Sequence, residues 1–184
     1  MSATRLQPGG TAFLDRDGTI NEPAAEGSYI TAPEQVRLLP GAAEAIRLLG
    51  ELPAKIVVVT NQRGIARGLM SEADLAAVNE RLVAELAREG SRLDAILHCP
   101  HEKGACECRK PGTAMFERAA READGVRIEG GAMIGDSSID VEAGNRLGLT
   151  TVRLGSTAAE EPRADHEAAD LLEAVRWLLG SRQS

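Results

Sequence analysis

The chain has 184 residues, and its 21 Lys and Arg against 28 Asp and Glu give a net charge of −7 at pH 7. This length suits one domain, and the acidic balance argues against a broad contact with nucleic-acid phosphates. A hydrophobic content of 43% excludes wholesale disorder, and no apolar run approaches the ~20 residues that a membrane span requires. The first ten residues lack the apolar stretch of a signal peptide, so we expect a cytoplasmic protein.

Short apolar runs alternate with amphipathic stretches along the whole chain. The predicted buried strands are Thr11–Leu14, Lys55–Val59, Asp94–Leu97, Ala132–Ile134 and Thr151–Leu154. The predicted helices are Gly41–Leu52, Ser71–Arg88, Thr113–Ala123, Ser138–Leu147 and His166–Leu179. This alternation favours an α/β fold with a doubly wound, Rossmann-like parallel sheet, in which ligands bind beyond the carboxyl ends of the strands. We expect a single domain over 1–184, with a motif-bearing core at about 11–154 and a C-terminal helix at 166–180.

Two carboxylates separated by one residue follow the first predicted strand, in the run Asp15-Arg16-Asp17-Gly18. Like charges held so close repel one another unless a cation or a shared proton lies between them. Mg²⁺ suits such a pair, because it takes one or two carboxylates and completes its shell with water and phosphate oxygens. The alternative is a solvated turn with an Asp-Gly corner, which is common in isolation.

Polar residues also follow later strands of the predicted sheet. Thr60 offers a hydroxyl beside free backbone N–H groups, which suits a phosphate, although a threonine also simply ends many strands. Lys110 would neutralise a phosphoryl group as a point charge, and taken alone it is equally an ordinary surface cation. Asp136 follows the fourth strand and would add a metal ligand.

The three cysteines stand so close together that they make a poor disulfide framework. Cys99 and His101 form one short arm, and Cys106 and Cys108 form a second. Three thiolates and one imidazole suit a closed tetrahedral Zn²⁺, which would be structural because no coordination position stays open. The alternative is three incidental buried thiols, and His98 competes with His101 as the fourth ligand.

Four motifs thus stand at successive strand ends of one doubly wound pattern, in the order Asp-x-Asp, Thr, Lys and Gly-Asp-x-x-x-Asp. This succession resembles the haloacid dehalogenase superfamily of phosphotransferases, and the resemblance runs from about Thr11 to Leu154. It implies that Asp15 attacks phosphorus and forms an aspartyl-phosphate. Asp17 would protonate the departing alcohol and then deprotonate water. Asp140 matches the last acidic position, and we expect it to support the site rather than bind metal.

The resemblance also implies the metal and phosphate contacts. Mg²⁺ would be held by Asp15, the main-chain carbonyl of Asp17 and Asp136. Thr60 and Lys110 would hold the equatorial oxygens of the phosphoryl group. The expected substrate-binding residues are Arg16, Asn61, Gln62, Arg63, Arg67, Arg109 and Ser137.

The cysteine loop ends in Cys108-Arg109-Lys110-Pro111, and within the superfamily such a loop is similar to two related groups. These groups are the D-glycero-D-manno-heptose 1,7-bisphosphate 7-phosphatases and the histidinol-phosphate phosphatases. The run at 64–68, Gly-Ile-Ala-Arg-Gly, resembles the first group, which implies Mg²⁺-dependent removal of the 7-phosphate. Two features depart from that group: Arg63 replaces a small hydroxyl residue, and Glu22–Ser28 lengthens a loop.

No insertion long enough for a cap domain separates these motifs. The loops Asn21–Pro33, Arg63–Met70 and Cys99–Arg109 must therefore shape the pocket themselves. Arg67 and Arg109 would suit a second phosphate on the substrate. We expect a small sugar phosphate as the partner, no nucleic acid, no membrane, and a monomer.

A receiver-like signalling domain is the alternative from another class, because it also uses an acceptor Asp, a Thr and a Lys on a doubly wound sheet. Its acceptor would follow a central strand later in the chain, whereas Asp15 follows the first strand. Asp17 also supplies an acid–base group, which a persistent phospho-switch would not need. Among enzymes, a histidinol-phosphate phosphatase or another small sugar-phosphate phosphatase is the alternative.

Overall fold

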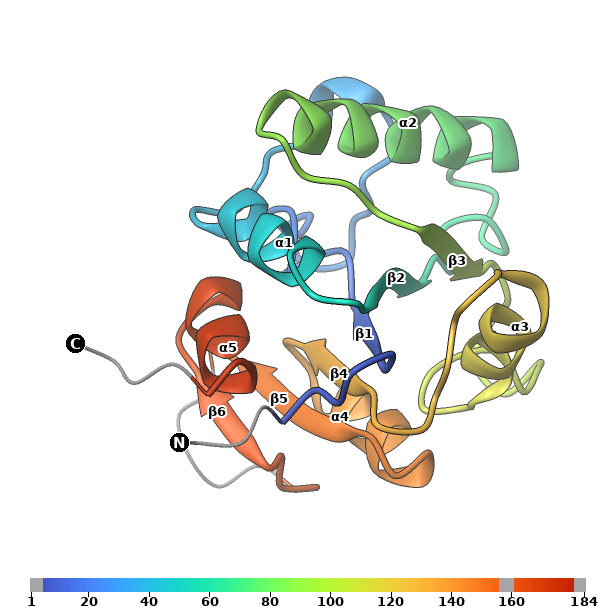
Figure 1. The fold of residues 1–184 in the computed structure, drawn as a ribbon. Helices are drawn as coiled ribbons and strands as arrows, with labels where there is room; N and C mark the ends of the chain where they lie inside the picture. The colour runs from blue at the N-terminus through green and yellow to red at the C-terminus, as the bar shows by residue number, and fades with distance from the viewer. Residues whose placement is uncertain (1–4, 156–160, 181–184) are drawn as a thin grey trace.

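The structure is a computed structural model that describes residues 5–155 and 161–180. Within these residues, six parallel strands form one sheet with the order β3-β2-β1-β4-β5-β6 (Figure 1). The strands are β1 (Thr11–Leu14), β2 (Lys55–Asn61), β3 (Ala95–Cys99), β4 (Ala132–Gly135), β5 (Thr150–Leu154) and β6 (His166–Ala168). The helices are α1 (Ala42–Gly50), α2 (Glu72–Arg88), α3 (Ala114–Glu122), α4 (Ser138–Arg146) and α5 (Leu171–Leu178), with a 3₁₀ turn η1 (Pro33–Gln35).

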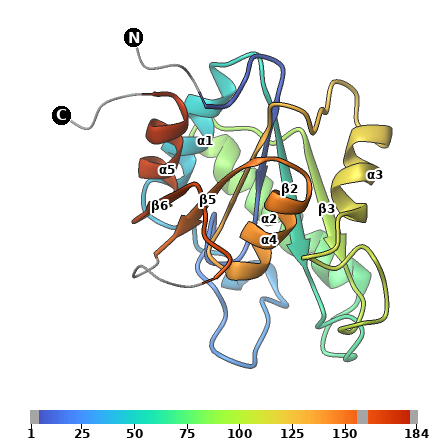
Figure 2. The same ribbon diagram turned by 90° about the horizontal axis from the view of Figure 1, so that it is seen from below.

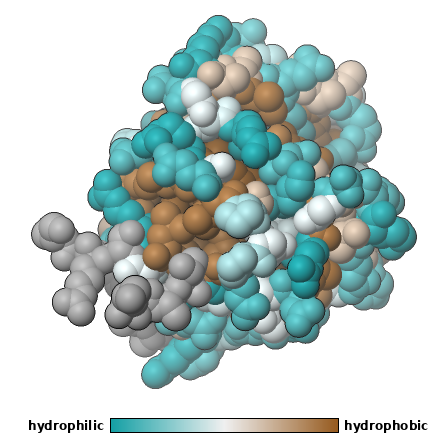
Figure 3. Space-filling model, in the orientation of Figure 1, coloured by the Kyte–Doolittle hydropathy of each residue, from teal (hydrophilic) through white to brown (hydrophobic). Residues whose placement is uncertain are grey.

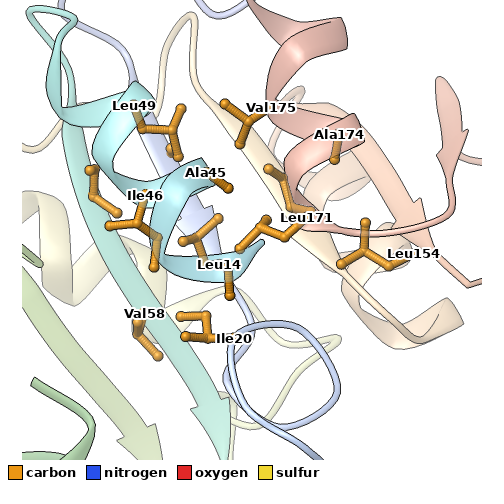
Figure 4. Packing of buried hydrophobic residues seen from close by; sticks show 14 of the residues in the cluster. Leu14, Ile20, Ala45, Ile46, Leu49, Val58, Leu154, Leu171, Ala174 and Val175 are labelled. Carbon is orange, nitrogen blue, oxygen red and sulfur yellow. The ribbon is translucent and has the colours of Figure 1, made fainter. Parts of the chain in front are cut away.

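Helices cover both faces of this sheet, because successive side chains of each strand point to opposite sides. Leu14 of β1 belongs to a buried cluster with α1, α2 and α5, whereas its neighbour Phe13 belongs to a cluster with α3 and α4. Figure 4 shows the first cluster, in which Leu14 and Val58 lie beside Ile46 of α1 and Val175 of α5 lies close by. Two covered faces on a parallel sheet confirm the predicted doubly wound α/β fold.

Helix α5 is held on the sheet by apolar and aromatic contacts. Figure 3, in the orientation of Figure 1, shows a hydrophobic area left of centre where α1 and α5 approach each other, surrounded by hydrophilic side chains. Leu52 and Trp177 are partly buried residues packed against the core there. The ring of His166 stacks on that of Trp177 at 4.3 Å between centroids, and the guanidinium of Arg5 lies 4.2 Å from the indole centroid.

The prediction of a single helix over His166–Leu179 is wrong in its first part. Residues His166–Ala168 form β6, which pairs with β5 in parallel and extends the edge of the sheet. The helix begins only at Leu171, because the side chain of Asp170 accepts a hydrogen bond of 2.8 Å from the backbone N–H of Glu173 and caps it. None of the described helices combines the length and the apolar character that crossing a bilayer requires.

The order of the strands creates a topological switch point between β1 and β4. The chain runs from β1 to β2 and β3 on one side of the sheet, then crosses back to β4, β5 and β6 on the other. Figure 2 shows the loops that follow β1, β2 and β3 extending from the same end of the sheet. In open α/β sheets this is the crevice where ligands bind.

Candidate active site

Two carboxylates stand at the switch point. Asp15 follows β1 and Asp136 follows β4, and these two strands pair side by side. In the loop after β1, the chain turns sharply at Gly18, whose φ is +83°. A Cβ built on Gly18 would lie 2.0 Å from Oδ2 of Asp136, so both the backbone conformation and the close approach require glycine. This turn brings the loop after β1 against the end of β4.

The ammonium group of Lys110 is buried among acidic oxygens. Its Nζ lies 2.8 Å from Oδ1 of Asp15 and 2.6 Å from Oδ1 of Asp140. It also donates a hydrogen bond of 2.7 Å to the carbonyl oxygen of Val59. Burial alone would lower the pKa of Lys110, but the carboxylates of Asp140 and Asp15 outweigh burial and raise that pKa. Lys110 therefore stays charged beside Asp15.

Negative charge is in surplus at this site. Carboxylate oxygens of Asp15, Asp136 and Asp140 all lie within 4.8 Å of one another. Burial raises the pKa of Asp15 from 3.8 to about 7, with Lys110 opposing and Asp140 adding to the rise. Desolvation, followed by the charge of Asp140, raises the pKa of Asp136 to about 6, although Asp136 is an exposed residue. Three carboxylates around one ammonium fit a hard divalent cation such as Mg²⁺.

We expect Mg²⁺ to stabilise the folded protein more at pH 8 than at pH 5.5. In the metal-free protein the raised pKa values mean that ionising Asp15 and Asp136 costs folding stability as the pH rises from 3.8 towards about 7. A bound cation removes that cost, whereas in acid it must first displace protons. The measurement is the Mg²⁺-induced shift of the unfolding midpoint at each pH. A shift as large at pH 5.5 as at pH 8 would contradict the expectation.

The carboxylate of Asp17 accepts hydrogen bonds on both oxygens. Arg16 donates from Nε to Oδ1 at 3.1 Å and from Nη2 to Oδ2 at 2.9 Å. Nδ2 of Asn21 donates to Oδ1 at 2.9 Å. Nε2 of Gln62 donates to Oδ2 at 2.9 Å and also to the hydroxyl of Thr60 at 2.9 Å. The predicted acid–base residue and the predicted phosphate-binding hydroxyl thus share one amide as a partner.

Two of the predicted substrate-binding residues hold other parts of the site in place. The amide of Asn61 accepts from the backbone N–H of Lys110 at 3.0 Å and donates to the Lys110 carbonyl at 3.2 Å. Ser137 donates to Oδ2 of Asp140 from its backbone N–H at 3.2 Å and from its hydroxyl at 2.6 Å. Substrate contact by Asn61 and Ser137 stays a prediction.

The predicted zinc ligands lie together at the end of β3, whose last residue is Cys99. The three sulfur atoms are 3.2 to 3.5 Å apart, and Nδ1 of His101 lies 3.2 Å from the sulfur of Cys108. A tetrahedron with Zn–S distances near ~2.3 Å has edges of about 3.8 Å, so the cluster is close to the size that zinc needs. Burial raises the pKa of the Cys99 thiol and raises that of Cys108 to about 12, so these two thiols need a bound cation to ionise. Burial also acts on Cys106, but hydrogen bonds from Cys108 and the Arg109 backbone outweigh it and lower the pKa of that thiol to about 7. His98, the competing ligand, instead lies 2.8 Å from the carboxylate of Glu72.

The loop that carries the zinc ligands is fastened to the loop after β2. The backbone N–H of Gln62 donates to the carbonyl of Cys99 at 2.8 Å. Glu102 lies between the two ligand arms, and its carboxylate is 3.0 Å from Nη1 of Arg63 and 3.6 Å from Nε of Arg67. The predicted substrate-binding residues Arg63 and Arg67 are therefore both paired with one acidic residue of the zinc loop.

A network of three residues joins all three loops that we expected to shape the pocket. Arg63, besides its contact with Glu102, donates from Nε to the hydroxyl of Tyr29 at 3.2 Å. Nothing in the sequence indicates Tyr29 or Glu102, because these contacts span 34 and 39 positions. Arg109 differs: its Nη1 is buried and has no hydrogen-bond partner among the described residues, which leaves the cost of burying that donor uncompensated.

An open cavity of about 510 Å³ lies next to the carboxylates, at the ends of β4, β5 and β6. Gly18, Thr19 and Asp136 form the part that borders the site. The other described residues that line it are mostly apolar: Pro23, Leu39, Pro40, Leu154, Gly155, Ala169, Asp170 and Leu171. No motif marks them in the sequence, because they come from separate segments that only the fold brings together.

Known proteins share this fold and these sequence features. Residues 107–178 match the family model described as HAD-hydrolase-like. The chain is 39% identical over 150 residues to the D-glycero-beta-D-manno-heptose-1,7-bisphosphate 7-phosphatase of Rhodopseudomonas palustris, covering 77% of this chain and 81% of that protein. It is 36% identical to the D-glycero-D-manno-heptose-1,7-bisphosphate 7-phosphatase of Chlorobaculum tepidum, covering 94% and 96%. The crystal structure of D,D-heptose 1,7-bisphosphate phosphatase from B. bronchiseptica, complexed with magnesium and phosphate, matches with a TM-score of 0.82 at 30% identity, covering 93% and 98%.

The fold and the site therefore define a phosphatase of the HAD-like class. The match to the C. tepidum protein covers almost the whole chain, so it includes the aspartates at the switch point as well as the zinc loop. The chain belongs to the family of the D-glycero-D-manno-heptose-1,7-bisphosphate 7-phosphatases. The resemblance inferred from the motifs is thereby confirmed.

Proposed function

We propose that the protein removes the 7-phosphate from D-glycero-D-manno-heptose 1,7-bisphosphate, with Asp15 as the nucleophile and Mg²⁺ as the catalytic metal. The observation that carries the proposal is the position of Asp15 at the switch point. It lies 2.8 Å from the ammonium of Lys110 and within 4.8 Å of Asp136. A receiver-like protein would not need the second aspartate, Asp17, and family membership supports the enzyme.

The proposed reaction has two steps. A carboxylate oxygen of Asp15 bonds to phosphorus while the bond from phosphorus to the sugar O7 breaks, and Asp17 gives the departing oxygen its proton. Water then attacks phosphorus, Asp17 takes the proton of that water, and the bond to Asp15 breaks. Phosphate is released, and both aspartates return to their starting states. Mg²⁺, held by Asp15, Asp136 and the Asp17 carbonyl, would supply charge neutralisation to the phosphate.

We propose that Lys110 and Thr60 hold the transferred phosphoryl group. The ammonium of Lys110 stands beside the attacking carboxylate, and Asp140 keeps it there. The hydroxyl of Thr60 accepts from Gln62, so its own proton is left to donate to a phosphate oxygen. Both donors would meet charge that spreads over the equatorial oxygens in the transition state.

Arg109, with Arg67 as a second cation, is proposed to bind the remote phosphate. The unpartnered Nη1 of Arg109 supports this assignment, since a buried donor without a partner is costly until an anion arrives. A charge-assisted hydrogen bond contributes roughly 1.5–3 kcal/mol. We therefore expect Arg109→Ala to lower kcat/KM for the bisphosphate roughly 10- to 100-fold and to leave a simple phosphomonoester within about threefold. Arg121→Ala, on the exposed face of α3, is the control and should change neither value.

A phosphate-release assay with Mg²⁺ tests the proposed substrate. The substrates are the heptose 1,7-bisphosphate, the heptose 7-phosphate and histidinol phosphate. We expect the highest kcat/KM for the bisphosphate, because the cationic end of histidinol phosphate would be repelled by Arg109 and Arg67. A higher kcat/KM for histidinol phosphate would contradict the heptose assignment, although the phosphatase assignment would stand.

We further propose that the enzyme acts as a monomer in the cytoplasm. All three loops that surround the site, and the network of Tyr29, Arg63 and Glu102 that joins them, come from one chain. A reducing compartment would keep the thiols of the zinc loop available as ligands. The molecular mass of the active enzyme in solution tests the first part, and activity confined to a dimer would contradict it.

A further inference from the structure

Arg16 is almost fully buried, although it stands between the two aspartates of the site. The exposed fraction of its side chain is 1%. Nε and Nη2 donate to the two oxygens of Asp17, and Nη1 donates at 3.0 Å to Oδ1 of Asn79 on α2. All three guanidinium nitrogens are therefore engaged within the protein, and we do not assign Arg16 a contact with substrate.

These contacts fix the orientation of the Asp17 carboxylate as well as its position. The planar fork of a guanidinium matches both oxygens of a carboxylate, so rotation of either group breaks a hydrogen bond. Asn79 holds the third nitrogen and ties the fork to α2. Asn21 and Gln62 each donate to one of the same two oxygens. The carboxylate therefore cannot turn without losing several of its partners.

We propose that Arg16 is a positioning residue, anchored by Asn79, that aims Asp17 at the oxygen of the leaving group. The proposal rests on the acid–base role of Asp17 in the proposed function. Proton transfer in the transition state requires the donor within hydrogen-bond reach of the departing oxygen. A sugar alkoxide leaves only with that proton, whereas 4-nitrophenolate is stable enough to leave without it. A misaimed Asp17 therefore slows the sugar phosphate far more than the aryl phosphate.

The experiment compares kcat/KM for the heptose bisphosphate with kcat/KM for 4-nitrophenyl phosphate, in the Mg²⁺-loaded enzyme. Arg16→Lys keeps the positive charge and loses the fork. It should lower the sugar value roughly 10- to 100-fold and the aryl value by no more than about threefold. Asn79→Ala keeps both hydrogen bonds from Arg16 to Asp17 and removes the acceptor of Arg16 Nη1. It should lower kcat/KM for the heptose bisphosphate roughly three- to tenfold and leave kcat/KM for 4-nitrophenyl phosphate unchanged.

Arg153→Lys is a matched control, because Arg153 is also 1% exposed and contacts both oxygens of Glu167, at 3.2 and 2.7 Å, between β5 and β6. It should leave the ratio of the two kcat/KM values unchanged.

Equal losses on both substrates in Arg16→Lys, or no loss in either variant, would overturn the proposal. If Arg16→Lys does not fold, Asn79→Ala decides by the same ratio. If the parent enzyme fails on the bisphosphate, the proposed substrate is wrong, and its best alkyl phosphate still tests Arg16.

Discussion

Replacing Asp15 by asparagine is expected to lower kcat by roughly 10⁴-fold or more while the protein stays folded. The amide cannot attack phosphorus, so the covalent route is closed. The fold tolerates the change because asparagine has nearly the same shape, and Lys110 keeps Asp140 and the Val59 carbonyl as partners. Burial also raises the pKa of Asp15 to about 7, so the metal-free protein already carries a neutral side chain at this position below that pH. The measurements are kcat and the unfolding midpoint.

The control for this variant is Asp17→Asn, which removes proton transfer and keeps the nucleophile. Its expected loss in kcat is smaller, roughly 10²- to 10⁴-fold, the usual contribution of a positioned acid–base group. A folded Asp15→Asn enzyme with kcat within about tenfold of the parent would show that Asp15 is not the nucleophile.

Replacing Cys106 or Cys108 by serine is expected to remove the zinc and to lower the free energy of unfolding by several kcal/mol. A structural zinc site contributes folding energy directly, and this one holds a loop that has little regular structure of its own. Activity should fall as well, because the zinc loop positions Lys110, which follows Cys108 by two residues. The backbone N–H and carbonyl of Lys110 both hydrogen-bond with the side chain of Asn61. Metal analysis should find about one Zn²⁺ per chain in the parent and none in the variants.

His98→Ala provides the matched control for the zinc prediction. His98 stands next to Cys99 in the sequence, but its ring lies beside Glu72 and outside the metal cluster. The variant should therefore keep its zinc and most of its stability. A parent protein that contains no zinc and has freely reactive thiols would contradict the structural role of the metal.

Elements with a strong repeating pattern could be predicted from the sequence, and very short ones could not. The apolar positions Leu75, Val78, Leu82 and Leu86 repeat at helical spacing, and all four are buried in α2. The hydroxyl of Ser71 accepts a hydrogen bond from the backbone N–H of Asp74 at the start of that helix, so the start of α2 could also be predicted from the sequence. Strand β6 has three residues, too few to show an alternation, and its existence depends on pairing with β5.

The same distinction applies to the site. Asp15, Thr60 and Asp136 could be placed together because parallel strands bring their carboxyl ends to one edge of the sheet. The zinc cluster was predictable because its ligands are close in the sequence. The partners of the arginines were not, since Arg16 meets Asn79 across 63 positions and Arg63 meets Glu102 across 39. Such contacts depend on how α2 and the loops pack, which no local pattern encodes.

The most direct test of the covalent mechanism is to identify the phosphorylated residue. The Asp17→Asn enzyme, incubated with Mg²⁺ and 4-nitrophenyl phosphate, should accumulate the intermediate, because 4-nitrophenolate leaves without a proton whereas breakdown of the intermediate lacks its base. After acid quenching and digestion, mass spectrometry should find one added phosphoryl group on the peptide that contains Asp15, and borohydride should reduce that residue to homoserine. A phosphoryl group on any other residue, or phosphate release by this variant with no labelled peptide at any time, would contradict the account.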